Sequence, residues 1–278
     1  MLQKVHILFF MENMLMLKKK LEESLLINQV KSEKWNVQFD AGRNARGKIG
    51  FVLIPNEQTI EKDMLSWAPK DVGMYFSRAI MPHEISTSAL AKCKDTLAET
   101  AKRILPDDKL DVICFACTSG AVAVGEDVSM KELLKAHPDS KATTLISGVR
   151  KALNKMKIKK LSVGTPYVDE LNTEMANYFV QNGFEILNFQ GMNLDYDKDM
   201  IRVTPEYLVE FAKAVDHSES NGFLMSCGAL RTMDVINQIE DAIGKPVIAS
   251  NQAMLWDCLR LAGINDKIPK LVRLFTEL

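Results

Sequence analysis

The chain has 278 residues, of which 47% are hydrophobic and 26% charged, and its formal net charge is −1. This length can hold one large domain or two lobes with a full core. The balanced charge excludes a polyanion-binding surface of the kind that nucleic-acid partners require.

The first 45 residues are expected to form an extension outside the folded lobes. An apolar stretch opens the chain, but Glu12 and Asn13 interrupt it before the roughly 20 residues that a membrane-spanning helix needs. Its lysines follow the apolar part, whereas a secretory signal has its basic residues first. We expect an amphipathic helix, or translated sequence ahead of a later start such as Met11 or Met14, and no membrane partner.

Short apolar runs alternate with segments of helical periodicity from about Lys48 onward. The apolar runs are bounded by Gly, Pro or Ser and predict buried strands of the parallel type at 48–55, 111–117, 141–147, 159–166, 222–227 and 245–250. Helical periodicity predicts helices at 96–105, 148–158, 169–183, 205–215 and 254–263. Pro205 suits a first helical turn, and Gly183 and Gly263 suit C-terminal caps. This alternation predicts an α/β fold with parallel sheets.

The chain also repeats itself weakly. The segments "FVLIPNEQTIEKDM" and "SVGTPYVDELNTEM" both read as a strand, a proline, a polar turn and a helix that opens with acidic residues. Pro55 and Cys117 are 62 residues apart (117 − 55), and Pro166 and Cys227 are 61 apart (227 − 166). The repeat predicts two pseudo-symmetric α/β lobes, one over 46–147 plus 252–278 and the other over 148–251. Chance similarity between α/β units is the alternative.

Cysteines are odd in number and widely spread, which predicts free thiols in a reducing, cytoplasmic compartment: Cys93, Cys114, Cys117, Cys227 and Cys258. Cys114 and Cys117 form a C-x-x-C pair, but no second pair lies at ligand spacing, so we expect no metal site. No phosphate-binding loop and no G-x-G-x-x-G follows a strand, so we expect no nucleotide cofactor.

Each repeat delivers a cysteine to the end of a predicted strand. Ligands bind beyond the carboxyl ends of parallel strands, so Cys117 and Cys227 are expected to meet in one cleft between the lobes. A thiol at a strand-to-helix junction lies near helix N–H groups, which are expected to lower its pKa. The N–H groups of Thr118, Ser119 and Gly228 could hold a carboxylate. A buried packing role is the alternative for either cysteine.

Four segments carry a family resemblance: "ACTSG" (116–120), "GTPYVDELN" (164–172), "SCGALRT" (226–232) and "KPVIASNQAMLWDCLRLAG" (245–263). From about Lys48 to Gly263 the sequence resembles the aspartate/glutamate racemase superfamily. Within it, the chain is most similar to the branch of maleate cis–trans isomerases, arylmalonate decarboxylases and ectoine-utilisation proteins. The resemblance implies two α/β lobes, cofactor-independent chemistry and an active site between the lobes, with Cys117 and Cys227 as its catalytic residues.

The resemblance also implies a set of substrate-binding residues. Thr118, Ser119, Gly228 and the Tyr167 hydroxyl match positions that bind substrate carboxylate in the family, and Asn193 is expected to join them.

One segment departs from the family pattern. Maleate isomerases carry P-S-S-N-T-T after the first strand, and the asparagine there contacts substrate. Here "IPNEQTIE" (54–61) puts Glu57 at that position, with Asn56 and Gln58 as neighbouring hydrogen-bond donors. The segment is closer to the D-Q-T form of the ectoine-utilisation members. An acid there would repel a dicarboxylate unless it is protonated or paired.

These features together predict a cytoplasmic, cofactor-independent isomerase or racemase. The expected substrate is a small acid with two carboxylates or an amino acid group, and we expect a homo-oligomer. One alternative is a malonate-type decarboxylase in which Cys227 alone donates the proton, although the decarboxylase pattern has glycine at the position of Cys117. Another is a non-catalytic small-acid binding protein.

Overall fold

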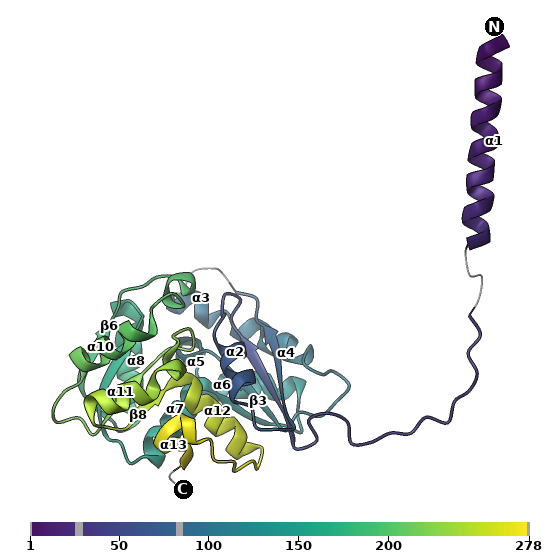
Figure 1. Cartoon of the computed structure of the whole chain (residues 1–278). Coiled ribbons are helices and arrows are strands. Elements are labelled where there is room, and N and C mark those ends of the chain that lie inside the picture. Colours follow the sequence, from purple (N-terminus) through teal and green to yellow (C-terminus); the bar gives the residue numbers. More distant parts are fainter. Residues whose placement is uncertain (1, 26–29, 82–85, 277–278) are drawn as a thin grey trace. The chain divides into compact units, whose positions relative to one another are not determined.

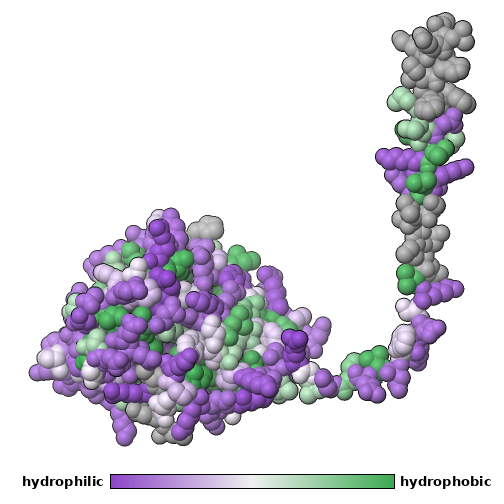
Figure 2. All heavy atoms as spheres, in the orientation of Figure 1, coloured by the Kyte–Doolittle hydropathy of each residue, from purple (hydrophilic) through white to green (hydrophobic). Residues whose placement is uncertain are grey.

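The computed structural model describes residues 2–25, 30–81 and 86–276, in two units, Met1–Ala41 and Gly42–Leu278. The first unit holds helix α1 (Leu2–Leu25), which confirms that the opening segment is helical, and an irregular segment over 30–41. Lysines and apolar side chains of α1 both face solvent between residues 11 and 23 (Figure 2). None of the helices described is both long enough and apolar enough to span a bilayer.

The second unit contains two parallel sheets of four strands with helices packed around them (Figure 1). The first sheet has the order β2-β1-β3-β4, and the second has the order β6-β5-β7-β8. Corresponding strands therefore follow one another in the same order, which makes the two lobes pseudo-symmetric. The strands are β1 (Gly47–Leu53), β2 (Val72–Arg78), β3 (Val112–Phe115), β4 (Lys141–Thr144), β5 (Lys160–Thr165), β6 (Glu185–Gly191), β7 (Gly222–Met225) and β8 (Val247–Ala249).

Helices follow most of the strands and cover the sheets. The α-helices of this unit are α2 (Ile60–Trp67), α3 (Thr87–Ala91), α4 (Lys94–Lys102), α5 (Thr118–Val124), α6 (Glu126–Ala136), α7 (Leu145–Lys155), α8 (Asp169–Gln181), α9 (Asp197–Met200), α10 (Pro205–Val215), α11 (Ile236–Ile243), α12 (Ser250–Leu261) and α13 (Val272–Thr276). Two 3-10 turns, Thr232–Asp234 and Pro269–Leu271, precede α11 and α13. Buried apolar side chains from both sheets form one continuous core.

All six predicted strands are present, each ending one to three residues before its predicted end, and two of them run directly into a helix. The segments 141–147 and 245–250 were expected to be extended throughout, yet α7 begins at Leu145 and α12 begins at Ser250. Side chains at the junctions start these helices. The Thr144 hydroxyl accepts the Ser147 N–H at 3.2 Å, and the Gln252 side chain accepts the Ala249 N–H at 3.3 Å. Gly183 and Gly263 both have a φ of +80°, as their predicted capping roles require.

The helices α7 and α12 pack closely against each other at the centre of the unit. Each follows the last strand of one sheet and also contacts a strand of the other. Gly148 permits the close approach, because a Cβ there would lie 3.0 Å from the Ala253 carbonyl oxygen and 3.2 Å from the Met254 Cα. This helix pair fixes the two sheets relative to one another, and so positions the carboxyl ends of their strands.

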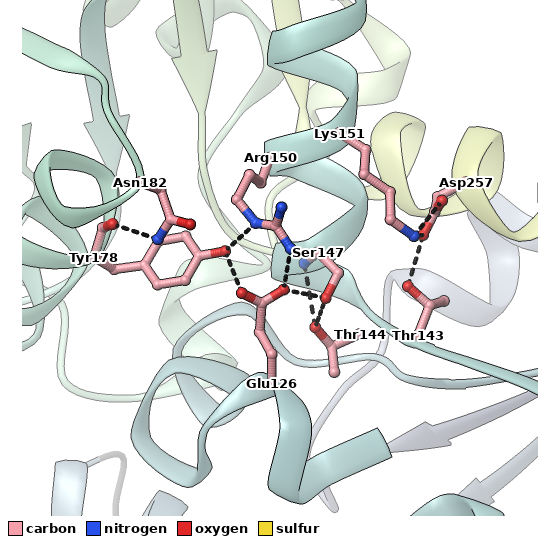
Figure 3. Close-up of polar contacts among 9 residues, drawn as sticks. All are labelled: Glu126, Thr143, Thr144, Ser147, Arg150, Lys151, Tyr178, Asn182 and Asp257. Atoms are coloured by element: carbon pink, nitrogen blue, oxygen red, sulfur yellow. Dashed lines mark hydrogen bonds and ion pairs between the residues drawn. The ribbon is translucent and has the colours of Figure 1, made fainter. Parts of the chain in front are cut away.

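A polar network joins α6, α7 and α8 beside this contact. Glu126 lies at its centre, with Ser147, Arg150 and Tyr178 pointing at its carboxylate (Figure 3). Burial alone would raise the pKa of Glu126, but these three hydrogen bonds outweigh it and hold the pKa below its ordinary value. The network thus ties α6, from the first lobe, to α8, from the second.

Candidate active site

Cys117 lies two residues beyond the end of β3 and begins α5. Its backbone is extended (φ −141°, ψ 125°), and its sulfur accepts the Gly120 N–H at 3.2 Å. Gly120 has to be glycine for this contact, because a Cβ there would lie 2.9 Å from the sulfur. The local sequence "CTSG" therefore folds so that the thiol takes the place of a helix-capping oxygen.

Cys227 lies two residues beyond the end of β7, the strand of the second sheet that corresponds to β3. Its φ is +146°, which a residue with a side chain rarely adopts. The Cys227 N–H donates to the Ser250 hydroxyl at 3.1 Å, and the sulfur accepts the Ala229 N–H at 3.3 Å. These two hydrogen bonds hold the strained backbone in place.

Both thiols line one cavity, with about 310 Å³ of empty space when its open mouth is included. The lining residues come from both lobes: Ile54, Glu57, Ala116, Cys117, Thr118, Ser119, Tyr167, Asp197, Cys227, Gly228 and Ala229.

Seven of the ten residues expected at the site line this cavity, and three do not. Asn56, Gln58 and Asn193 are exposed to solvent. Asn56 and Gln58 flank Glu57, and of these three residues only Glu57 is buried. Asp197 lines the cavity although nothing in the sequence singled it out among the neighbouring acids Asp195 and Asp199.

Tyr167 connects the thiols to the hydroxyl groups of the cavity. Its side chain is buried, and its hydroxyl acts on the same cavity as Cys227 and Ser119, which both influence its pKa. Burial, with a smaller contribution from the two nearby thiols, raises the pKa of Tyr167 well above its ordinary value. The phenol therefore remains neutral and can donate a hydrogen bond.

Neither thiol has the lowered pKa that its place at the end of a strand predicts. Burial raises the pKa of Cys117 well above its ordinary value and that of Cys227 to about 12. The hydrogen bonds from Gly120 and Ala229 act in the opposite direction but are outweighed, and the charge of Asp197 raises both values further. The expectation of lowered pKa values was therefore wrong, since desolvation exceeds the effect of the local N–H groups.

Glu57 and Asp197 bring two carboxyl groups to the cavity. Glu57 accepts the N–H groups of Thr59 and Ile60 at the start of α2, yet burial raises its pKa. Burial, with a smaller contribution from the charge of Glu57, also raises the pKa of Asp197 to about 7. Among the described residues, no hydrogen bond or ion pair involves the Asp197 carboxylate.

Hydrogen-bond donors occupy another part of the lining. Thr118 Oγ1 is buried and has no hydrogen-bond partner among the described residues, and the Ser119 hydroxyl lies 3.9 Å from the Cys117 sulfur. Gly228 is held by its carbonyl oxygen, which accepts from Asn251 Nδ2 at 2.8 Å. An unpaired buried hydroxyl is costly, so a ligand oxygen that accepts from Thr118 would be stabilised here.

The arrangement suits proton transfer to and from a small bound acid. Two thiols can act as base and acid, and neighbouring hydroxyl and N–H groups can hold a carboxylate whose negative charge increases during reaction. Among the residues that the structure describes, no three His, Cys, Asp or Glu side chains are grouped in a way that could hold a metal ion.

Comparisons with known proteins agree with this architecture. A family model described as arylmalonate decarboxylase matches residues 50–275. The arylmalonate decarboxylase of Bordetella bronchiseptica is 31% identical over 138 residues, which is 49% of this chain and 58% of that enzyme. The chain thus matches little more than half the length of this relative.

Maleate isomerases are also similar. The enzyme of Alcaligenes faecalis is 24% identical over 190 residues, which is 64% of this chain and 74% of that protein. A solved structure of the Nocardia farcinica maleate cis–trans isomerase superimposes with a TM-score of 0.74 at 19% identity, covering 84% of this chain and 99% of that one. That structure is of a cysteine-to-serine mutant with a covalently bound succinylcysteine intermediate.

Proposed function

The chain belongs to the arylmalonate decarboxylase family, and from that membership we propose that it is a cofactor-independent isomerase or racemase of a small carboxylic acid. One observation carries the proposal: Cys117 and Cys227, from corresponding strand ends of the two lobes, line the same cavity. One thiol on each side of a substrate is what a reaction that moves a proton from one face to the other needs.

In the racemase form of the proposal, one cysteine acts as a thiolate and the other as a thiol. The thiolate removes the proton from the carbon next to the carboxylate, and the electron pair of the C–H bond moves into the carboxylate to give an enediolate. The opposite thiol then protonates that carbon on its other face. Thr118, Ser119 and Tyr167 stabilise the enediolate oxygens with hydrogen bonds.

In the cis–trans form, Cys117 adds as a thiolate to an activated double bond. Cys227 protonates the carbanion that the addition leaves, and the adduct rotates about the resulting single bond. Cys227 then removes that proton again as the C–S bond breaks, which releases the thiolate of Cys117 and gives the other isomer. The succinylcysteine of the Nocardia isomerase supports this route, because such an adduct is what thiolate addition to a four-carbon unsaturated diacid would give.

Decarboxylation is the second candidate, favoured by the family match and by the Bordetella relative. The apolar part of the lining, which includes Ile54, Ala116 and Ala229, would expel one carboxylate as carbon dioxide, and Cys227 would protonate the remaining carbanion. Cys117 argues against decarboxylation, because the decarboxylases that the chain resembles have a glycine at that position.

The experiment that tests the proposal incubates the protein with small mono- and dicarboxylic acids in deuterium oxide. Racemisation places deuterium on the carbon next to the carboxylate, and proton spectra of maleate-like acids reveal cis–trans conversion that escapes labelling. Carbon dioxide release would identify decarboxylation instead. Binding of an acid, detected by thermal stabilisation, without labelling, isomerisation or gas release would show a binding protein and contradict the proposal.

A further inference from the structure

The charged side chains among the described lining residues of the cavity are both acidic. Among the described lining residues, Glu57 and Asp197 are the only titratable groups besides the two thiols and Tyr167, and none is Lys, Arg or His. Among the described residues, Arg78 is the cation whose charge acts on Glu57; its guanidinium pairs with Glu61 at 2.7 and 2.9 Å and donates to the Glu57 backbone oxygen at 2.9 Å. The ion pair of Arg78 is therefore with Glu61, and among the described residues Arg78 forms none with the carboxylate of Glu57 or Asp197.

Asp197 differs from an ordinary structural acid. It is 5% exposed, it lines the cavity, and no donor among the described residues contacts its carboxylate. The chain turns into α9 at this residue, so the backbone fixes its position. Its charge raises the pKa of both cysteine thiols, as expected for an acid that lines the same cavity. A buried carboxyl without a partner is costly unless it is protonated or meets a cation from outside the chain.

The lining thus offers two kinds of contact. Thr118, Ser119 and Tyr167 offer hydroxyl donors, which suit one carboxylate. Glu57 and Asp197 offer acceptors, and of these only Asp197 is without a partner among the described residues. A substrate with two carboxylates would place its second one among like charges, whereas an ammonium group there would neutralise them.

We infer that Asp197, supported by Glu57, binds a protonated amino group of the substrate, and that the substrate is an amino acid rather than a dicarboxylic acid. The inference rests on the proposed function for its reaction. An amino acid without a double bond cannot undergo cis–trans isomerisation, so the two thiols exchange its α-proton. The C–H bond breaks toward one thiolate, the S–H bond of the other thiol breaks toward the opposite face, and the two cysteines exchange protonation states.

Three acids that differ in one substituent test this inference: alanine carries an ammonium group, methylmalonate a carboxylate and isobutyrate a methyl at the same position. Their ethyl homologues, 2-aminobutyrate, ethylmalonate and 2-methylbutyrate, extend the set. Binding of each to the full chain is measured by NMR titration at pH 8. We expect the amino acids to bind at least 10-fold more tightly than either of the matched acids.

The variant Asp197→Asn should weaken amino acid binding at least 10-fold and strengthen that of the malonates. Asp199→Asn, on the same short helix but outside the cavity lining, is the matched control and should leave every affinity within about twofold. Equal or tighter binding of a malonate or monoacid to the parent, no binding of either amino acid, or unchanged affinities in a folded Asp197→Asn would overturn the inference. Amino acids that bind as expected but take up no deuterium would contradict the proposed function alone.

Discussion

The two cysteines occupy corresponding places but differ in their backbones. Cys117 is extended and caps a helix, whereas Cys227 has a φ of +146° and depends on the Ser250 hydroxyl. The sequence predicts that both thiols stand at strand ends, because the apolar runs stop there. It does not predict the strain at Cys227, because that strain arises from contacts with a residue 23 positions later in the chain.

The positive φ of Cys227 predicts how a glycine at this position changes stability. At an ordinary strand or helix position glycine is about 0.5–1 kcal/mol less stable than alanine, but at positive φ the order is reversed. We therefore expect Cys227→Gly to unfold at the same or a higher denaturant concentration than Cys227→Ala. Urea unfolding of the two variants measures this difference, and a glycine variant less stable by about 1 kcal/mol would show that the backbone is unstrained.

Asp197 predicts how stability depends on pH. Burial raises its pKa from an ordinary 3.8 to about 7, so between about pH 4 and 7 the folded chain holds a proton that the unfolded chain has lost. The carboxyl therefore lowers the free energy of unfolding as pH rises through this range, and the loss is complete above pH 7. We expect Asp197→Asn to be more stable than the parent by about 2 kcal/mol at pH 8, which is half of the free energy that corresponds to the whole pKa shift. At pH 4 we expect the two proteins to be nearly equal in stability.

Thermal or urea unfolding of both proteins at the two pH values measures this effect. Comparing the variant with the parent at each pH cancels the contributions of other groups, including Asp63, whose pKa burial also raises to about 7. A destabilising effect of Asp197→Asn at pH 8 would mean that the carboxylate has a partner that the unliganded structure does not show.

At the scale of elements, the sequence predicts the inner strands better than the edge strands. The inner strands β1, β3, β5 and β7 are continuous apolar runs because both faces of each are covered. The strands β2 and β6, which were not predicted, are edge strands whose side chains are mostly half-buried, so their sequences lack a clear apolar run. The helices α7 and α12 begin earlier in the chain than predicted. At the start of α7, Leu145, Ile146 and the small residues around them also suit a buried strand.

The contact between α7 and α12 predicts an unusual cost for alanine. Alanine in place of a helical glycine normally stabilises a chain by about 1 kcal/mol. At Gly148 the added Cβ meets backbone atoms of Ala253 and Met254 at 3.0–3.3 Å, and backbone cannot move aside as a side chain can. We expect Gly148→Ala to lower the free energy of unfolding by about 1–3 kcal/mol.

Lys155→Ala, at an exposed position near the end of the same helix, serves as the control and should change stability by less than about 0.5 kcal/mol. Equilibrium unfolding in urea compares the three proteins. A stabilised Gly148→Ala would show that α7 and α12 lie farther apart than the structure has them.

At the scale of the whole molecule, the internal repeat of the sequence appears as two sheets with the same strand order. Because parallel strands bring their carboxyl ends to one edge, a repeat that puts a cysteine after the third strand of each sheet predicts the pair at the cavity. The repeat does not show how tightly the cavity closes. Burial there decides the protonation of Cys117, Cys227, Glu57 and Asp197, and it comes from side chains distant in sequence.

The same burial explains why both thiols are neutral. A thiolate in this cavity would lie near Glu57 and Asp197, and none of the described lining residues is a cation that could compensate it. A positively charged group that entered with the substrate would lower the pKa of both thiols. Substrate binding and activation of the nucleophile or base would then be coupled.

The central claim is that the sulfurs of residues 117 and 227 perform the chemistry together. The most direct measurement is the turnover of Cys117→Ala and Cys227→Ala with the acid that the deuterium screen identifies, alongside Cys258→Ala, which removes a buried thiol outside the cavity lining. We predict that each of the first two variants loses at least about 100-fold in kcat while binding changes little, and that the third stays close to the parent. Turnover near that of the parent in both cavity variants would contradict the account.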